Sequence, residues 1–442
     1  TQPINPSDML TFEEWLEGTQ YTLAEKAKIT AAVDEQFPKR HDPKLRKRKA
    51  FVKDEEYAKI NHARLICAGE DLFKGIFGPY WKVVENQIFS LPHFAKHIPR
   101  VDLADALVGL AAKVMPILIE GDDCIYFDGT LYLVGDFESY ESLLVVALTR
   151  AIERRALRRI HLHTLSEDLA LLADEVYGWD GRPTTVHTNQ VQAKGPARRF
   201  SGDNQTSLGN GLANFLIWLF IQSNNLPITP DTFLRYGFRI KLSTHDSGSS
   251  ASFCGVICDQ YERQLVKNPV PVLLKFGWSK KHQIGFSDKK VKSMLRVKAL
   301  SLAYEHPGCP ILSAFAGSVL RLTAGSGLRG VWKHLTYWER EKLSAALRVP
   351  IVLEPPGPRT RLLVEEQFDI SVATQLRVEE YFDKVEDLKP FDVDALGLSV
   401  PDWSRRLFCD YTGHYPYRED WIENCPIPSK VAGKLAHSSV RK

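Results

Sequence analysis

Three short acidic stretches carry the side chains best suited to chemistry on a phosphate. The first is Gly121-Asp122-Asp123, the second is Gly135-Asp136 with Glu141 five residues after the aspartate, and the third runs from Ser201 to Asn210. Two divalent cations held about 3.5–4 Å apart can activate a hydroxyl for attack and stabilise the leaving group. Because hard ions such as Mg²⁺ prefer carboxylate oxygens, Asp122, Asp123 and Asp136 are the candidate metal ligands.

The third stretch contains side chains that suit a ribose. Thr206 and Asn210 lie four residues apart, so on a helix they share one face and present a hydroxyl and an amide. An amide can donate to and accept from a 2′-hydroxyl, the group that distinguishes RNA from DNA. Gly202 gives a flexible backbone ahead of this helix, and Glu141 could hold the same sugar from the other side. A polar helix start capped by Ser201 or Thr206 is the alternative interpretation.

The Gly-Asp-Asp triplet is weak evidence alone, because a Gly-Asp pair is also common in turns. Three short strands are expected around it, from Ile117 to Glu120, from Cys124 to Phe127 and from Leu131 to Val134, since these runs are apolar and rich in β-formers. Asp128-Gly129 is a strong signal for a tight turn. The triplet is therefore expected at the tip of a hairpin, and Asp136 at the end of the following strand.

The remaining pattern is mostly helical. Helices are expected over residues 11–18, 23–37, 70–90 and 140–160, and from about residue 206. On the last of these, one apolar face is expected at Leu208, Leu212, Phe215, Leu216 and Leu219. Strands are expected at 63–67, 238–242 and 252–257. From about residue 269 onward the chain is expected to be mostly helical, with a break at 353–358.

Composition places the chain among ordinary globular proteins, with 44% hydrophobic and 25% charged residues in a length of 442. That length allows a large core and two or three lobes. The net charge of +3 says little about partners, but basic residues cluster at 39–53, at 150–159 and at 275–298. Such runs suit phosphate contacts and suit solvated helix faces equally well.

The cysteines and the apolar runs bound the environment of the protein. The chain has seven cysteines, an odd number, so no disulfide framework is predicted. No signal peptide is visible, and no apolar run is long enough to span a bilayer. We therefore expect a soluble protein of a reducing compartment, without a transmembrane segment.

The stretch from Ser201 to Gly211 resembles motif B of viral RNA-dependent RNA polymerases, especially those of the nodavirus-like and tombusvirus-like groups. The stretch from Asp136 to Glu141 is similar to their motif A, in which a second acid follows the aspartate by five residues. Three further motifs of that family have similar segments here: motif F in Phe51-Val52-Lys53 with Arg64-Leu65-Ile66, motif D in Gly237–Lys241, and motif E in Ser252–Gly255. The resemblance covers roughly residues 50–260.

The order of these segments differs from that of the nodavirus-like and tombusvirus-like enzymes. Their Gly-Asp-Asp hairpin, motif C, lies between motifs B and D, whereas the Ser223–Phe233 connection here holds no hairpin signal and a single acid, Asp231. The Gly-Asp-Asp of this chain lies upstream of motif A, and this C–A–B order resembles that of permutotetravirus and birnavirus polymerases. In the family fold, the second hairpin strand runs antiparallel beside the motif A strand, so a tight turn at Asp128-Gly129 can join them.

By this resemblance the fold is α+β, mixed and helix-rich, with the fingers, palm and thumb of a right-hand polymerase and a permuted palm. Residues 1–115 would form an N-terminal extension and fingers with motif F, 116–145 the palm with motifs C and A, and 146–198 further fingers. Residues 199–265 would complete the palm with motifs B, D and E. Residues 266–425 would form the thumb, and 426–442 a C-terminal tail.

The resemblance also implies roles for single residues. Asp122 and Asp136 would act in catalysis by binding two Mg²⁺ or Mn²⁺ ions, with Asp123 as a secondary ligand. Five would position the incoming nucleotide and its sugar, namely Glu141, Ser201, Gly202, Thr206 and Asn210. Lys53 and Arg64 would bind the triphosphate. Lys241 would act in catalysis by donating a proton to the pyrophosphate, with a solvated strand-end lysine as the alternative.

The implied activity is that of an RNA-dependent RNA polymerase, which replicates a viral RNA genome by nucleotidyl transfer from NTPs to an RNA 3′ end and releases pyrophosphate. Expected partners are template and product RNA, NTPs and other viral replication proteins, with no DNA. The expected location is the host cytoplasm, including membrane-associated replication sites reached through partners. One alternative is a reverse transcriptase, against which Glu141 and Asn210 argue, because a DNA maker usually blocks the 2′-hydroxyl with a bulky group. The other is a non-catalytic palm-fold protein that binds RNA.

Overall fold

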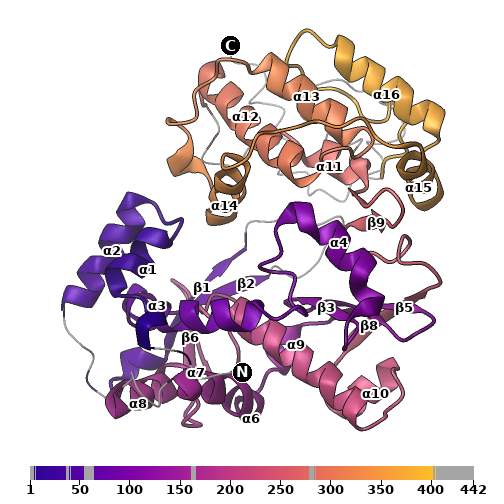
Figure 1. Cartoon of the computed structure of the whole chain (residues 1–442). Coiled ribbons are helices and arrows are strands. Elements are labelled where there is room, and N and C mark those ends of the chain that lie inside the picture. The colour runs from indigo at the N-terminus through magenta and orange to yellow at the C-terminus, as the bar shows by residue number, and fades with distance from the viewer. Residues whose placement is uncertain are drawn as a thin grey trace, which may run out of the picture. The chain divides into compact units, whose positions relative to one another are not determined.

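In the computed structural model, the described residues are 4, 6–35, 39, 41–53, 64–160, 166–277, 283, 285–401 and 404. The expected C-terminal tail, 426–442, lies outside them. The chain divides into two compact units, one made of Thr1–Pro269 with Gly277–Glu386 and the other of Val270–Phe276 with Asp387–Lys442. All predicted site residues belong to the first unit, where helices and strands are interleaved along the chain (Figure 1). This confirms the expected mixed, helix-rich α+β class.

The predicted metal ligands lie on a four-stranded antiparallel sheet. Its strands, in spatial order, are β3 (Ile117–Glu120), β4 (Asp123–Phe127), β5 (Tyr132–Phe137) and β8 (Ile240–His245). The β3–β4 hairpin and its direct connection to β5 confirm the prediction from the apolar runs. At the β4–β5 turn, Asp128 Oδ1 accepts hydrogen bonds from the backbone N–H groups of Thr130 at 2.8 Å and Leu131 at 2.7 Å.

The two faces of this sheet belong to different cores. Ile119 and Phe137 lie in a core shared with α3 (Asp71–Phe89) and α9 (Thr206–Ser223). Leu118 and Ile125 lie in a second core, which includes residues of α4 (Leu103–Val108) and of the segment from 251 to 265. Successive side chains of a strand point to opposite faces, so the alternation of these apolar residues buries both faces.

Helix α9 begins at Thr206, as predicted, but its predicted apolar face is wrong in part. Leu216 and Leu219 are 36% and 39% exposed, whereas Asn210 and Asn214 are 5% and 0% exposed. The buried side of α9 therefore includes two amides. These amides bond other parts of the chain, as described below, and such partners are what make buried polar side chains tolerable.

A second four-stranded sheet has the order β2-β1-β6-β7. Its strands are β1 (Lys47–Val52), β2 (Leu65–Ala68), β6 (Thr184–His187) and β7 (Gln192–Gly195). β1 pairs with β2 in antiparallel fashion and with β6 in parallel fashion. The strand predicted at 63–67 is therefore β2, displaced slightly, and β1 is a strand that the basic run at 39–53 concealed.

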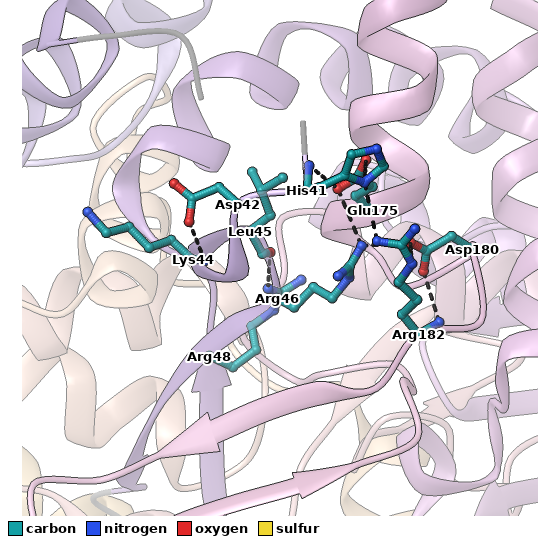
Figure 2. Close-up of polar contacts among 9 residues, drawn as sticks. All are labelled: His41, Asp42, Lys44, Leu45, Arg46, Arg48, Glu175, Asp180 and Arg182. Carbon is teal, nitrogen blue, oxygen red and sulfur yellow. Dashed lines mark hydrogen bonds and ion pairs between the residues drawn. The ribbon is translucent and has the colours of Figure 1, made fainter. Parts of the chain in front are cut away.

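Ion pairs fix the chain just before β1 to two acids on a distant segment. Arg46 Nη2 lies 3.3 Å from Glu175 Oε2 and 2.8 Å from Asp180 Oδ2, and His41 Nδ1 lies 3.2 Å from Glu175 Oε1 (Figure 2). Arg182 adds contacts to His41 and Asp180. At Arg46, the basic run therefore neutralises a protein carboxylate that is buried, since Glu175 is only 2% exposed.

The helix expected from 140 to 160 is interrupted. It consists of α5 (Tyr140–Leu143), α6 (Val146–Thr149), a π-helical turn (Arg150–Arg154) and α7 (Arg155–Ile160). Between α5 and α6, Val145 forms an antiparallel β-bridge with Arg198. This pairing joins residues far apart in the sequence, so the local periodicity could not reveal it.

The helices at the start of the chain agree with their predictions. They are α1 (Phe12–Gly18) and α2 (Leu23–Glu35), and α8 (Glu167–Val176) follows later in the chain. Thr11 begins α1 with a capping box, in which its hydroxyl accepts from Glu14 N and the Glu14 carboxylate accepts from Thr11 N. Such reciprocal caps satisfy backbone donors that the first helical turn leaves open.

Within the described residues, the chain from Pro269 onward is mostly helical, as predicted. Its elements are α11 (Pro269–Lys275), α12 (Asp288–Glu305), α13 (Leu312–Leu322), α14 (Tyr337–Ala346), α15 (Pro358–Phe368) and α16 (Val372–Lys384). They are preceded by α10 (Pro230–Arg235), β9 (Ile257–Asp259) and β10 (Gln264–Val266). No helix among the described residues combines the length and the hydropathy needed to cross a membrane.

The strand predicted at 252–257 is wrong for most of its length. Phe253 and Val256 bond each other across a tight turn, and the two residues between them, Cys254 and Gly255, have φ values of 51° and 73°. Left-handed backbone of this kind ends an extended strand. β9 therefore starts only at Ile257.

Candidate active site

A row of charged side chains crosses all four strands at one end of the β3–β4–β5–β8 sheet. The register pairs Glu120 with Asp123, Asp123 with Asp136, and Asp136 with Lys241. Residues directly opposite each other in antiparallel strands project from the same face. Three carboxylates and one ammonium therefore share one face. We call Glu120, Asp123 and Asp136 the acid row.

Asp122 lies beside the acid row, in the two-residue turn between β3 and β4. Gly121, the first residue of this turn, has a φ of 62°, as hairpin turns that begin with glycine require. The carbonyl oxygen of Asp122 accepts a hydrogen bond from Phe137 N at 3.4 Å, so the turn is held against the end of β5. The structure thus brings Asp122, Asp123 and Asp136 to one end of the sheet, as the sequence predicted.

Asp122 and Asp123 are half-buried, Asp136 is exposed, and the three carboxylates repel one another. Burial raises the pKa of Asp122, the nearby Glu141 and Asp136 charges raise it further, and the Arg64 charge opposes them. Burial also raises the pKa of Asp123, with added contributions from Asp122 and Asp136, to about 6. Crowded acids with raised pKa values mark a place where a cation would be stabilising.

The donor set is suited to a hard divalent cation. Asp122, Asp123 and Asp136 offer carboxylate oxygens, the ligands that Mg²⁺ and Mn²⁺ take in proteins. Because these carboxylates repel one another, their negative charge is also complementary to that of a divalent cation. Among the residues that the structure describes, no group of three His, Cys, Asp or Glu side chains is arranged as a metal cluster. The fit of these residues to such an ion thus rests on donor type and charge.

Helix α9 meets the acids through Asn210. Asn210 Nδ2 donates to Glu141 Oε1 at 3.3 Å, and the Tyr140 hydroxyl donates to the Asn210 carbonyl at 3.4 Å. Tyr140 and Glu141 belong to α5, which directly follows β5. Asn210 is buried and Glu141 is half-buried, so Glu141 is the more accessible member of the pair.

The loop before α9 packs tightly onto β2. Gly202 N donates to the Cys67 carbonyl at 3.1 Å, and a Cβ on Gly202 would lie only 2.8 Å from that oxygen. The Ser201 hydroxyl donates to the Leu65 carbonyl at 3.3 Å. Gly202 is therefore required for this close approach, and the loop carries Ser201 to the strand that follows Arg64.

A buried ion pair and a threonine complete this loop. Arg48 Nε lies 2.9 Å from Asp203 Oδ1, and Arg48 Nη2 donates to the Val176 carbonyl at 2.6 Å. The Thr206 hydroxyl donates to the carbonyls of Phe200 at 2.6 Å and of Asp203 at 2.9 Å. The Thr206 hydroxyl thus braces the loop. Neither Ser201 nor Thr206 caps the helix, since Gln205 occupies the N-cap position of α9.

The predicted phosphate-binding residues lie together where the β1–β2 pair meets its connecting segment. Lys53 N donates to the Arg64 carbonyl at 2.8 Å, and the residues between them, 54–63, lie outside the described part. Arg64 is exposed, and its charge acts on Asp122. At least one predicted phosphate ligand is therefore within electrostatic range of Asp122.

Lys241 lies at the far end of the charged row. Its Nζ lies 3.1 Å from Glu138 Oε1, and the lysine side chain is 69% exposed. The hydrogen bond and charge of Glu138 raise the pKa of Lys241, which keeps its ammonium protonated. A protonated lysine beside the acid row is compatible with proton donation. Its exposure is equally compatible with the alternative, a solvated lysine at the end of a strand.

Two residues near the site, Glu120 and Asn214, escaped prediction from the sequence, and a third, Cys254, was predicted only as part of the segment that resembles motif E. Glu120 joins the acid row only because the register places it opposite Asp123. Cys254 Sγ lies 3.7 Å from Asp123 Oδ2, and burial raises the pKa of the Cys254 thiol. Asn214 contacts the hairpin turn from α9. Of Glu120 and Asn214, only Asn214 had a signal in the sequence, because it is a polar residue four positions after Asn210 in a mostly apolar helix.

Comparison with known proteins finds likeness in three-dimensional structure alone. No family model and no curated protein sequence matches this chain. Similar solved structures include the RNA polymerase VP1 of infectious pancreatic necrosis virus, at 12% identity and a TM-score of 0.49, and the birnavirus VP1–VP3 complex, at 13% identity and 0.46. The matches cover 91% and 87% of this chain and 65% and 54% of those chains. This chain therefore spans less than two thirds of the length of either neighbour.

Proposed function

We propose that this protein is an RNA-dependent RNA polymerase that replicates a viral RNA genome. The proposal rests mainly on one observation. The acid row and Asp122 lie at one end of a sheet, and α9 touches both the hairpin turn and Glu141 at that same end. Ligands for catalytic cations and candidate ribose contacts are thus held by one small set of elements, as template-directed nucleotidyl transfer requires.

Asp122, Asp123 and Asp136 would hold two Mg²⁺ or Mn²⁺ ions. When bound, such ions supply activation of the attacking 3′-hydroxyl and stabilisation of the pyrophosphate leaving group. The chain's own residues position the reactants. Asp123 and Asp136 are directly opposite each other on adjacent strands, and strands give a catalytic group a more rigid support than loops do.

The incoming nucleotide would lie between the β1–β2 hairpin and α9. Arg64 and Lys53 would bind the triphosphate, and the exposed position of Arg64 near Asp122 supports this role. Ser201 and Gly202 would shape the sugar site through the loop that packs on β2, and Thr206 would keep that loop in place. Lys241 would donate a proton to the departing pyrophosphate.

Selection of ribonucleotides would depend on Glu141. Asn210 donates to Glu141 Oε1, which fixes the orientation of the carboxylate and leaves its acceptor capacity for a 2′-hydroxyl. A hydroxyl buried against a fixed acceptor favours the ligand that has it over the ligand that lacks it. This arrangement supports an enzyme that makes RNA over one that makes DNA.

The lobes and partners belong to the proposal as well. Residues 116–145 and 199–265 would form the palm, 1–115 and 146–198 the N-terminal extension and fingers, and 266–425 the thumb. Partners would be template and product RNA, NTPs and other viral replication proteins. The protein would act in the host cytoplasm, including membrane-associated replication sites reached through those partners.

Primer extension by the purified protein tests the proposal. A primed heteropolymeric RNA template would be incubated with Mg²⁺ or Mn²⁺ and with either rNTPs or dNTPs. Wild-type protein is expected to extend the primer with rNTPs, and Asp136→Asn is expected to abolish extension. Preference for dNTPs would favour a reverse transcriptase. Absence of extension in wild type, with retained binding of the RNA, would favour a non-catalytic RNA-binding protein.

A further inference from the structure

One amide of α9 holds the Gly-Asp-Asp turn through the main chain. Asn214 is fully buried, and its Nδ2 donates to the carbonyl of Gly121 at 3.0 Å and to the carbonyl of Asp123 at 3.2 Å. These two residues flank Asp122 in the sequence. The hydrogen bonds therefore bracket the tip of the hairpin and leave the carboxylate of Asp122 free of this contact.

The orientation of this amide is fixed by its acceptors. Turning the amide over would place Asn214 Oδ1 against two carbonyl oxygens, and oxygen cannot donate to them. In the observed orientation, Asn214 Oδ1 is buried and finds no hydrogen-bond partner within the described part of the chain. A buried acceptor without a partner is unfavourable. An apolar side chain would fill this space without leaving a buried acceptor unpaired. The contribution of the amide is therefore its two hydrogen bonds to the turn.

The amide approaches the turn from the side opposite the acid row. Ile119 and Cys124, next to the turn, belong to the core that includes α9, whereas Glu120, Asp123 and Asp136 alternate with such residues and project from the other face. Asn214 therefore supports the backbone from behind the carboxylates. One helical turn earlier, Asn210 bonds Glu141, so a single side of α9 holds both groups.

From this geometry we infer that Asn214 is a positioning residue, which fixes the Gly121–Asp123 turn so that the carboxylates of Asp122 and Asp123 can share a divalent cation. The inference rests on the proposed function, since it concerns the cation site of that reaction. It makes a claim of its own, namely that loss of the amide weakens cation binding in the absence of RNA and nucleotide. It also predicts that kcat falls while KM for NTPs changes little.

The test compares Asn214→Asp, Asn214→Ala and a control at the C-cap of the same helix. Asn214→Asp keeps the size of the side chain but faces the two carbonyls with acceptors, and Asn214→Ala removes the amide without adding repulsion. Asn224→Asp is the control, because Asn224 is exposed and its Nδ2 donates to the Phe220 carbonyl at 2.8 Å, within α9 and away from the acids. Mn²⁺ binding would be measured on each full-length protein by electron paramagnetic resonance, with melting temperature and primer extension beside it.

We expect Mn²⁺ affinity to fall by about 10-fold or more in both Asn214 variants and to stay at the wild-type value in Asn224→Asp, as residues behind metal ligands typically behave. Affinity within about twofold of wild type in a folded Asn214→Ala protein, with only its melting temperature lowered, would overturn the inference. So would Mn²⁺ binding by wild type that Asp136→Asn does not reduce. If wild type binds Mn²⁺ through Asp136, and Asn214→Ala weakens that binding, then the inference holds even where primer extension fails.

Discussion

Asp203 and Asp123 are both withdrawn from water, but their neighbours carry opposite charges. Burial raises the pKa of Asp203, and the guanidinium groups of Arg48 and Arg199 oppose that effect. Burial raises the pKa of Asp123 as well, and there the carboxylates of Asp122 and Asp136 add to it. The fold supplies its own cation at Asp203, whereas at the acid row it gathers anions.

The region around Asp203 has a second buried ion pair in which an arginine of the chain neutralises an acid. Arg199 and Glu153 pair within the core with side chains 1% and 4% exposed, and burial lowers the pKa of Arg199 to about 10. Gly209 makes room for this arginine, because a Cβ there would lie 2.2 Å from the guanidinium. Internal pairing of this kind serves structure. This fold neutralises some buried acids with its own arginines and leaves others crowded together. The difference teaches that the crowded acids are candidates for binding a cation from outside the protein.

The largest effect is expected from Asp122→Asn. Loss of a carboxylate beside the acid row should lower kcat for primer extension by on the order of 10³-fold. The melting temperature should not fall, because the substitution removes repulsion from Asp136 and Glu141. Asp128→Asn is the matched control, since Asp128 is exposed in the same meander and an asparagine Oδ1 can still accept from Thr130 and Leu131. A lower melting temperature in Asp122→Asn would show that Asp122 stabilises the fold, and would contradict the proposed difference between Asp122 and Asp203.

Arg48→Met should have the opposite profile. Arg48 is 1% exposed, so its loss leaves Asp203 buried without its main cation, and the free energy of unfolding should fall by about 3–5 kcal/mol. Urea unfolding followed by circular dichroism measures the change. Lys384→Met breaks an exposed pair with Glu380 and should leave the urea midpoint unchanged. An unchanged midpoint in Arg48→Met as well would mean that Asp203 does not depend on the internal cation.

Gly202→Ala tests the loop that joins the two regions. A methyl group there would press on the Cys67 carbonyl and on Ala68, so stability should fall by about 1–3 kcal/mol. KM for NTPs should rise, because the displaced loop carries Ser201. Gly195→Ala is the control, since a Cβ on Gly195 would meet no described atom within 4 Å. Equal behaviour of the two variants would remove the loop from the nucleotide site.

The smallest effect is expected from Glu141→Gln. An amide in place of the carboxylate weakens acceptance from a 2′-hydroxyl, and the ratio of kcat/KM for rNTPs over dNTPs should fall by about 10-fold. Competition assays with matched rNTP and dNTP pairs give this ratio directly. Glu167→Gln, on the exposed first turn of α8, should leave it unchanged. A ratio that does not move in Glu141→Gln would assign sugar selection elsewhere.

Local sequence predicted the elements that carry the acids. The β3–β4–β5 meander follows from apolar runs and the Asp128-Gly129 turn, and the start of α9 follows from the Ser201–Asn210 stretch. The neighbourhood of Asp122 and Asp136 was predictable because hairpins are local structures. Local sequence pattern therefore predicted the strand ends and the turn, where the predicted metal ligands lie.

Non-local contacts account for what the sequence did not reveal. The strand β1 pairs with β2 and β6 although its first three residues are basic, and Val145 breaks a helix by pairing with Arg198. Glu120 enters the acid row through strand register, a relation that spans the turn. The buried side of α9 follows from bonds between Asn214 and a hairpin about ninety residues earlier. Helical periodicity alone predicted that the leucine side would be buried. It depends on the polarity of each side chain and contains no information about hydrogen bonds to distant parts of the chain.

The most direct test of the contrast between the two regions is the effect of Mn²⁺ on thermal unfolding of wild type and of Asp136→Asn. A ligand that binds only the folded state at 100 times its Kd adds about 2.7 kcal/mol to the free energy of unfolding. The account predicts that Mn²⁺ raises the melting temperature of wild type clearly and that of Asp136→Asn little or not at all. An equal rise in both proteins, or none in wild type, would contradict the claim that the acid row binds a divalent cation.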